Sequence, residues 1–229
     1  MKYRSVLLAA ASGSVGGCCF SRSKQGPYIR RRAIGVDRNT RAQIAVRGAF
    51  AALAGQWHSV LTHDQRTTWE TFARNTPLRD ALGRNHRITG HNAYIRANSL
   101  RLIAGYPIID NAPTVFAETT LTPPVLALAD ASSQLISLTL ATTDPWNNQD
   151  DGALLTFMAP PQNASIAGYA GTYVLADVTP GVFGSPSPTT AFVSPLRINT
   201  GQRVFLRHRA FAEDSRISPP WTSTIVVTP

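Results

Sequence analysis

The chain has 229 residues, of which 43% are hydrophobic and 15% are charged, and its formal net charge at pH 7 is +9. The hydrophobic fraction is sufficient for a packed core, and the low charged fraction argues against charge-driven disorder. No apolar run reaches the roughly 18 residues that a membrane-spanning helix needs. The cysteines are the adjacent pair Cys18 and Cys19, which excludes a disulfide framework and a cysteine-rich zinc site.

The positive charge is concentrated in the first half of the chain. Residues 1–110 carry 17 cationic and 5 acidic side chains, a net charge of +12, whereas residues 111–229 have a net charge of −3. Nearly every cation is an arginine, which pairs well with carboxylates and phosphates. The charge therefore predicts an acidic partner, such as nucleic acid, an anionic membrane or an acidic protein surface. A genome rich in arginine codons would explain the arginines but not the asymmetry.

Residues 1–36 are predicted to form a basic extended arm or hairpin. Lys2 and Arg4 precede an apolar run that is typical of a signal peptide, but its length of about seven residues is too short, so we expect no signal peptide. Two β-prone runs, 14–20 and 27–34, flank a turn-like centre at 21–26. A two-stranded hairpin is only marginally stable in water, so we expect a neighbouring subunit to hold this arm.

Residues 37–110 are predicted to form a helical module. Asn39 and Thr40 can cap a first helix with these apolar residues on one face: Val46, Phe50, Leu53 and Trp57. Thr62 and Gln65 have the spacing of a capping box, which opens a second helix that ends near residues 76–77. Residues 84–90 are predicted to form a loop or short strand, and a third helix spans about 91–104.

Residues 111–229 are predicted to form an immunoglobulin-like sandwich that resembles a fibronectin type III module. Short alternating runs recur between turn residues, at the spacing of an all-β domain. The expected strands are 115–118, 125–129, 135–141, 153–158, 172–176, 190–193, 203–211 and 223–227. The whole chain is thus expected to be of the α+β class.

No catalytic, cofactor-binding or metal-binding residue is predicted, and we expect the protein not to be an enzyme. The five histidines lack the spacing of metal ligands and are expected to be solvated or hydrogen-bonded. Residues 150–152, Asp-Asp-Gly, are predicted to form a hairpin turn rather than a calcium loop. Cys18 and Cys19 are predicted to be packing residues.

The strongest polar feature is an arginine run with a tyrosine beside it. The residues expected at a partner or assembly interface are Arg22, Lys24, Tyr28, Arg30, Arg31, Arg32, Arg38, Arg41 and Arg47. Such an arm can neutralise DNA phosphates without reading sequence, or it can pair with acidic patches and add a strand to a neighbour's sheet.

The order of motifs in the first half resembles uncharacterised proteins of phage and prophage structural gene regions, which pair a basic N-terminal module with a C-terminal immunoglobulin-like domain. The motifs are at residues 12–17 (SGSVGG), 26–30 (GPYIR), 57–69 (a tryptophan at each end with LT and QR between) and 89–98 (TGHNAYIRAN). The resemblance implies a virion protein and carries over no activity and no functional residue.

We therefore expect a non-enzymatic structural protein of a bacteriophage particle, assembled in the host cytoplasm. A capsid decoration or minor capsid protein is favoured, and a tail or head–tail connector component, a DNA-binding module and an immunoglobulin-like adhesin remain open. The expected partners are major capsid or tail protein subunits in a homo-oligomer or symmetric multi-copy assembly. Non-specific contact with DNA phosphates is compatible with this role, and no membrane partner is expected.

Overall fold

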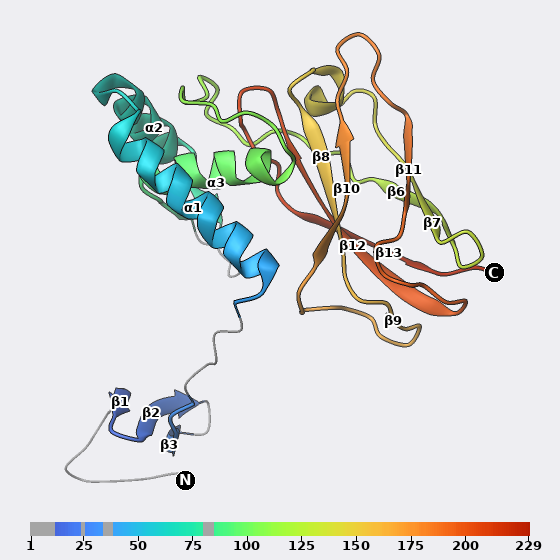
Figure 1. Ribbon diagram of the computed structural model, residues 1–229, viewed down its shortest axis with the longest axis horizontal. Coiled ribbons are helices and arrows are strands. Elements are labelled where there is room, and N and C mark those ends of the chain that lie inside the picture. The colour runs from blue at the N-terminus through green and yellow to red at the C-terminus, as the bar shows by residue number, and fades with distance from the viewer. Residues whose placement is uncertain (1–11, 24–25, 34–38, 80–84) are drawn as a thin grey trace. The chain divides into compact units, whose positions relative to one another are not determined.

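The computed structural model describes residues 12–23, 26–33, 39–79 and 85–229 (Figure 1). The chain divides into two compact units, Met1–Ile44 and Ala45–Pro229, and each is described by itself. Two of the predicted interface residues, Lys24 and Arg38, lie outside the described residues. Within the described ranges no helix is long and apolar enough to cross a membrane.

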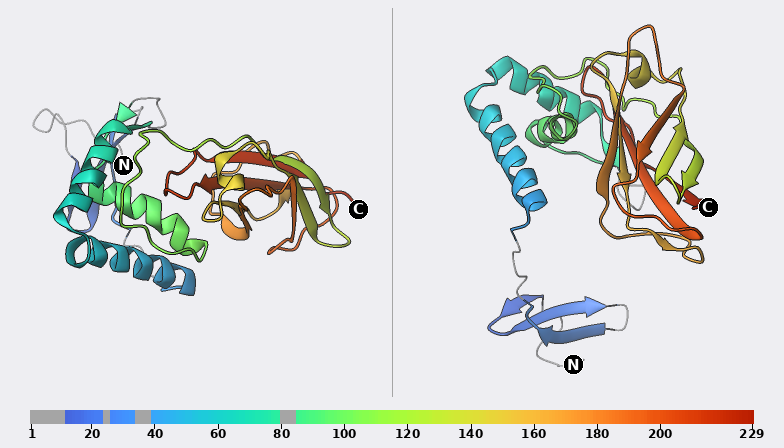
Figure 2. Two further views of the ribbon diagram at one scale, coloured as in Figure 1. Left: turned by 90° about the horizontal axis from the view of Figure 1, so that it is seen from above. Right: turned by 45° about the vertical axis from the view of Figure 1, so that its right-hand side comes forward.

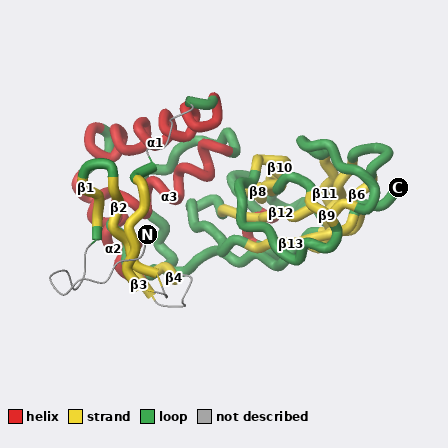
Figure 3. Tube along the Cα trace, turned by 90° about the horizontal axis from the view of Figure 1, so that it is seen from below, coloured by secondary structure: helices red, strands yellow, loops and turns green. Residues whose placement is uncertain are grey.

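The first unit contains a three-stranded antiparallel sheet in the order β1 (Gly13–Val15), β2 (Cys18–Ser23) and β3 (Gly26–Arg31), as Figure 3 shows. The predicted first run folds back on itself, because Val15 pairs with Cys18 across a two-residue glycine turn. Gly16 has a φ of 55°, a left-handed conformation that glycine adopts without steric cost. The predicted hairpin is thus a meander with one more strand.

The helices are α1 (Arg41–Ser59), α2 (His63–Asn75) and α3 (Gly90–Ile103). The capping box at Thr62 and Gln65 is confirmed, since each side chain accepts a hydrogen bond from the other's backbone N–H. Only half of the predicted apolar face of α1 is covered. Leu53 and Trp57 are buried, whereas Val46 and Phe50 are each about half exposed.

Helices α2 and α3 cross at a glycine. A Cβ on Gly90 would lie 2.6 Å from the backbone nitrogen of Glu70, so only glycine permits this approach. The crossing buries Trp69 and Tyr94, whose rings meet edge to face at 5.5 Å. Between the helices, β4 (Leu78–Arg79) pairs with β5 (Asn85–His86), so the predicted short strand is confirmed and its partner is a strand that the sequence pattern did not reveal.

The remaining strands form a β-sandwich of two antiparallel sheets (Figure 1, Figure 2). One sheet has the order β11 (Thr189–Val193), β7 (Leu135–Thr139) and β6 (Val125–Asp130). The other has the order β10 (Val174–Pro180), β8 (Ala153–Met158), β12 (Gln202–Phe211) and β13 (Trp221–Val226), and β9 (Gln162–Asn163) pairs with β12. The second sheet thus has five strands, of which β9 is a two-residue addition, and two packed antiparallel sheets of this kind are an immunoglobulin-like arrangement. The α+β class and the sandwich are therefore confirmed.

The sandwich core lies between the two sheets. It includes Ile136, Leu138, Leu154 and Leu206, all buried, and Trp146 from a short 3-10 helix, η1 (Pro145–Asn148). Backbone carbonyls hold the loop around Trp146 tightly, since a Cβ on Gly181 would lie 2.0 Å from the Trp146 oxygen. Residues 150–151 form the predicted turn, which a Gly152 N–H closes on the Gln149 carbonyl.

The strand predicted at 115–118 is wrong. This segment contains bends and pairs with no described strand, and Glu118 instead forms an ion pair with Arg96 of α3 at 3.0 Å. The next residue, Thr119, donates its N–H to the carbonyl of Ile217. Val115 and Phe116 are of types common in strands, but here they belong to a connection between the helices and the sandwich, which composition alone does not distinguish from a strand.

Candidate functional site

Four of the predicted interface residues, Tyr28, Arg30, Arg31 and Arg32, lie in β3 or directly after it. Among the described residues, β3 is an edge strand. β3 hydrogen-bonds to β2 on one side, and the sheet order places no described strand on its other side. Successive side chains of a strand point to opposite faces, so Tyr28 and Arg30 share one face and Arg31 lies on the other. Arg30, Arg31 and Arg32 are exposed, and Tyr28 is partly buried.

The other predicted interface residues are more dispersed. Arg22 stands in β2 opposite Pro27, and Arg41 is the first residue of α1. Arg47 is exposed on α1 within the second unit. The structure therefore brings together the arginines of β3 and its C-terminal extension, and it leaves Arg47 on a different unit.

This small sheet has almost no core. Among its residues whose exposure is described, none is buried, and Val15 is 73% exposed. Cys19 and Phe20 are only partly covered. A three-stranded sheet of this size gains little stability from burying apolar surface.

The cysteines differ in their surroundings. Cys18 is exposed, so its predicted packing role is wrong. It is paired with Val15 on one side and Arg31 on the other, but no second layer of the described residues covers the face on which it lies. Cys19 lies opposite Ser14 on one side and Arg30 on the other. Hydrogen bonding from Ser14, with a smaller contribution from Arg30, lowers the pKa of the Cys19 thiol.

The histidines form no site that could hold a metal. Within the described ranges, no group of three or more His, Cys, Asp or Glu side chains converges. His58 and His91 lie 5.8 Å apart, and His91 packs edge to face on Trp57. His208 is buried inside the sandwich, where Nδ1 lies 3.2 Å from Thr156 Oγ1 and Nε2 lies 2.7 Å from Ser223 Oγ. Sequence reasoning did not identify this buried network.

Arg101 is the residue that sequence reasoning most clearly missed. This residue lies in α3, and its side chain is fully buried. It donates hydrogen bonds to the backbone carbonyls of Pro107, Asp151 and Glu213. Its guanidinium also lies 5.2 Å from the ring centroid of Phe211 on β12. These contacts join the helices to the sandwich, so this arginine is structural and does not face a partner.

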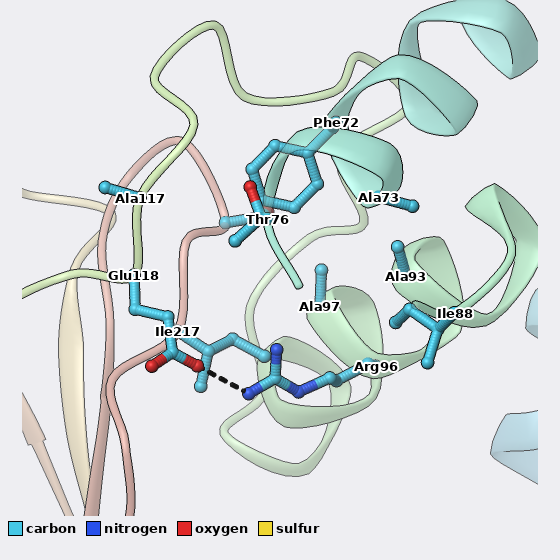
Figure 4. Close-up of a pocket in the computed structure, with 11 residues that line it drawn as sticks. Phe72, Ala73, Thr76, Ile88, Ala93, Arg96, Ala97, Ala117, Glu118 and Ile217 are labelled. Atoms are coloured by element: carbon cyan, nitrogen blue, oxygen red, sulfur yellow. Dashed lines mark hydrogen bonds and ion pairs between the residues drawn. The ribbon is translucent and has the colours of Figure 1, made fainter. Parts of the chain in front are cut away.

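A cavity lies beside the Arg96–Glu118 ion pair, between α2, α3 and the loop at residue 217 (Figure 4). Its walls include Phe72, Thr76 and Ala97, and its volume is about 20 Å³. That is room for about one water molecule. Buried hydroxyls of Thr76 and Ser215 without a protein partner line it, so it suits a structural water rather than a substrate.

Comparison with known proteins adds a distant structural likeness. The fibronectin type III domain of human fibronectin type III domain containing protein 3, a solution structure, is similar over 49% of this chain and 88% of its own, with 13% identity and a TM-score of 0.31. No family model matches the chain, and no curated protein matches it. The assignment of the sandwich rests on the strand pairing described above.

Proposed function

We propose that this protein is a non-enzymatic structural component of a bacteriophage particle, most simply a capsid decoration or minor capsid protein. The arginine-bearing sheet of the first unit docks on an acidic surface of a major capsid or tail protein, and the β-sandwich is displayed. The observation that carries the proposal is the edge of β3 on which no strand of the described residues pairs, with three consecutive exposed arginines, Arg30–Arg32, at its C-terminal end.

An open edge strand is a template for pairing with another chain. Alternate residues of an antiparallel strand direct their N–H and C=O groups to opposite sides, so about half of the backbone groups of β3 (Gly26–Arg31) point away from β2. Strand addition would supply the hydrogen bonds that give affinity, and the side chains would supply specificity. Pairing would also bury more of the partly exposed Phe20 and Ile29. This would stabilise a sheet that has almost no core of its own.

The arginines define the chemistry of the partner. Arg30 and Arg31 point to opposite faces of the sheet, so a partner strand with acidic side chains on both faces matches them. Bidentate pairing of guanidinium with carboxylate fixes the register of such a complex. The virion assignment rests on the resemblance of the first-half motifs to proteins of phage structural gene regions.

The test is incorporation into particles in cells that produce the phage. The variant carries R30Q, R31Q and R32Q, and the control carries R74Q, R87Q and R197Q, which remove the same charge from exposed positions outside the first unit. We expect the full chain and the control to co-purify with particles. The amount of the variant in the particles should be at least about tenfold lower.

Three results would overturn the proposal. The first is the absence of the full chain from purified particles, and the second is equal incorporation of the variant. The third is release of the full chain by nuclease treatment, because this would assign the arginines to DNA phosphates rather than to a protein partner.

A further inference from the structure

The outer face of the sheet that contains β8 and β12 carries a pocket. The proposed docking function does not involve this pocket. It has a volume of about 420 Å³ and lies where the end of α3 approaches β8 and β12. That volume is within the range of small-molecule sites. Its main walls are Leu100, Phe157, Tyr173, Arg207, Arg209 and Pro220.

Two arginines give this pocket its charge. Arg207 and Arg209 are two residues apart on β12, so both point away from the sandwich core, while His208 between them points into it. The guanidinium of Arg207 lies over the ring of Tyr173, with its carbon 4.1 Å from the ring centroid. This cation–π contact restrains the position of the side chain in the pocket.

Arg209 is the less satisfied of the two. Its Nε is buried and has no hydrogen-bond partner. No acidic side chain lines the pocket, and the nearby carboxylate of Glu118 is already paired with Arg96 at 3.0 Å. Burial, with Arg96 and Arg207 as neighbouring cations, lowers the pKa of Arg209. The pocket therefore holds positive charge that no lining carboxylate neutralises.

Apolar side chains make up much of the remaining lining. Leu100, Phe157 and Pro220 line the pocket, so a ring placed against them would remove apolar surface from water. Bare phosphate or sulfate would use the arginines and leave these walls uncovered.

We propose that this pocket binds a small molecule in which an oxyanion, carboxylate or phosphate, is attached to a ring of about monosaccharide size. The oxyanion accepts hydrogen bonds from Arg209 and Arg207, and the ring packs against Phe157 and Pro220. The site is independent of the docking edge of β3, which belongs to the other unit.

The test is calorimetric titration of the full chain with four probes: D-glucuronate, glucose 6-phosphate, neutral D-glucose and inorganic phosphate. We expect at least one of the two acidic sugars to bind with a Kd of about 1 mM or tighter, and glucose and inorganic phosphate to bind at least about tenfold more weakly. An acidic sugar that carries a carboxylate and one that carries a phosphate distinguish the two sources of the oxyanion.

Variants locate the site. Arg209→Gln and, separately, Arg207→Gln should weaken binding by about tenfold or more, since each removes a charge-assisted hydrogen bond. Arg203→Gln is the matched control, because it lies on the same face of β12 but outside the pocket. Thermal melting shows that each variant is folded, and Arg207→Gln is informative even where Arg209→Gln destabilises the sheet.

The proposal is overturned if neither acidic sugar binds at about 10 mM. It is equally overturned if inorganic phosphate binds as tightly as the sugars, since the ring would then contribute nothing. Unchanged binding in both pocket variants would place the anion elsewhere on the chain.

Discussion

Acid should destabilise the sandwich through His208. The imidazole is fully buried between Thr156 and Ser223, whose hydroxyls contact its two nitrogens at 3.2 and 2.7 Å. Burial disfavours the charged form and lowers the pKa of His208 from 6.5 to about 4. The folded state therefore holds this histidine neutral under conditions in which the unfolded chain would protonate it.

The sign and size follow from linkage. Because the folded pKa is the lower one, the unfolded chain binds more protons between pH 6.5 and about 4. The contribution of His208 to stability is complete above pH 6.5 and is lost as the pH falls toward 4. A pKa lower by about 2.5 corresponds to about 3 kcal/mol of unfolding free energy.

Urea unfolding, followed by tryptophan fluorescence, measures this loss. The wild type and His208→Gln are compared at about pH 8 and pH 4, and the difference between their pH dependences isolates the histidine from the carboxylates. We expect the wild type to lose about 3 kcal/mol more than the variant, while His63→Gln, at an exposed histidine, keeps the wild-type pH dependence. Equal pH dependence in wild type and His208→Gln would refute the reasoning.

Three further substitutions test the packing. Gly181→Ala should cost about 2–4 kcal/mol, because its Cβ would lie 2.0 Å from the Trp146 oxygen, whereas Gly168→Ala, with open space around it, should be nearly neutral in thermal melting. Arg101→Met should lower the unfolding free energy by about 3 kcal/mol and speed proteolysis, since three backbone carbonyls lose their donor. Thr62→Ala should cost about 1 kcal/mol in urea unfolding, because it removes the capping box of α2.

Local patterns predicted the elements whose structure is decided locally. The capping box of α2 depends on residues three apart, and the strands of the sandwich show the alternation that one buried face imposes. The same reasoning wrongly predicted a strand at 115–118, because those residues form a connection that pairs with no described strand. The apolar face predicted for α1 is only partly buried. Val46 and Phe50 have the expected helical spacing but remain about half exposed.

Burial of polar residues could not be predicted in the same way. Arg101 was counted among the cations that would attract an acidic partner, yet its partners are backbone carbonyls 50 and 112 residues further along the chain. Only tertiary packing brings those carbonyls to α3. The proposed interface on β3 was partly predictable, since the arginine run is visible in sequence. The strand β1, which pairs with the other side of β2, was not.

The net charge of a segment is a poor guide to the charge of a site. The second half of the chain has a net charge of −3, yet it contains a pocket with two uncompensated arginines, Arg207 and Arg209. None of its acids lines this pocket, and several have partners elsewhere: Asp130 accepts from neighbouring serines, Asp144 accepts from Thr122, and Glu118 pairs with Arg96. Ionic strength should therefore affect binding at the two proposed sites to different extents. Docking through β3 uses several exposed charges and weakens steeply with ionic strength, whereas the partly buried pocket is screened less.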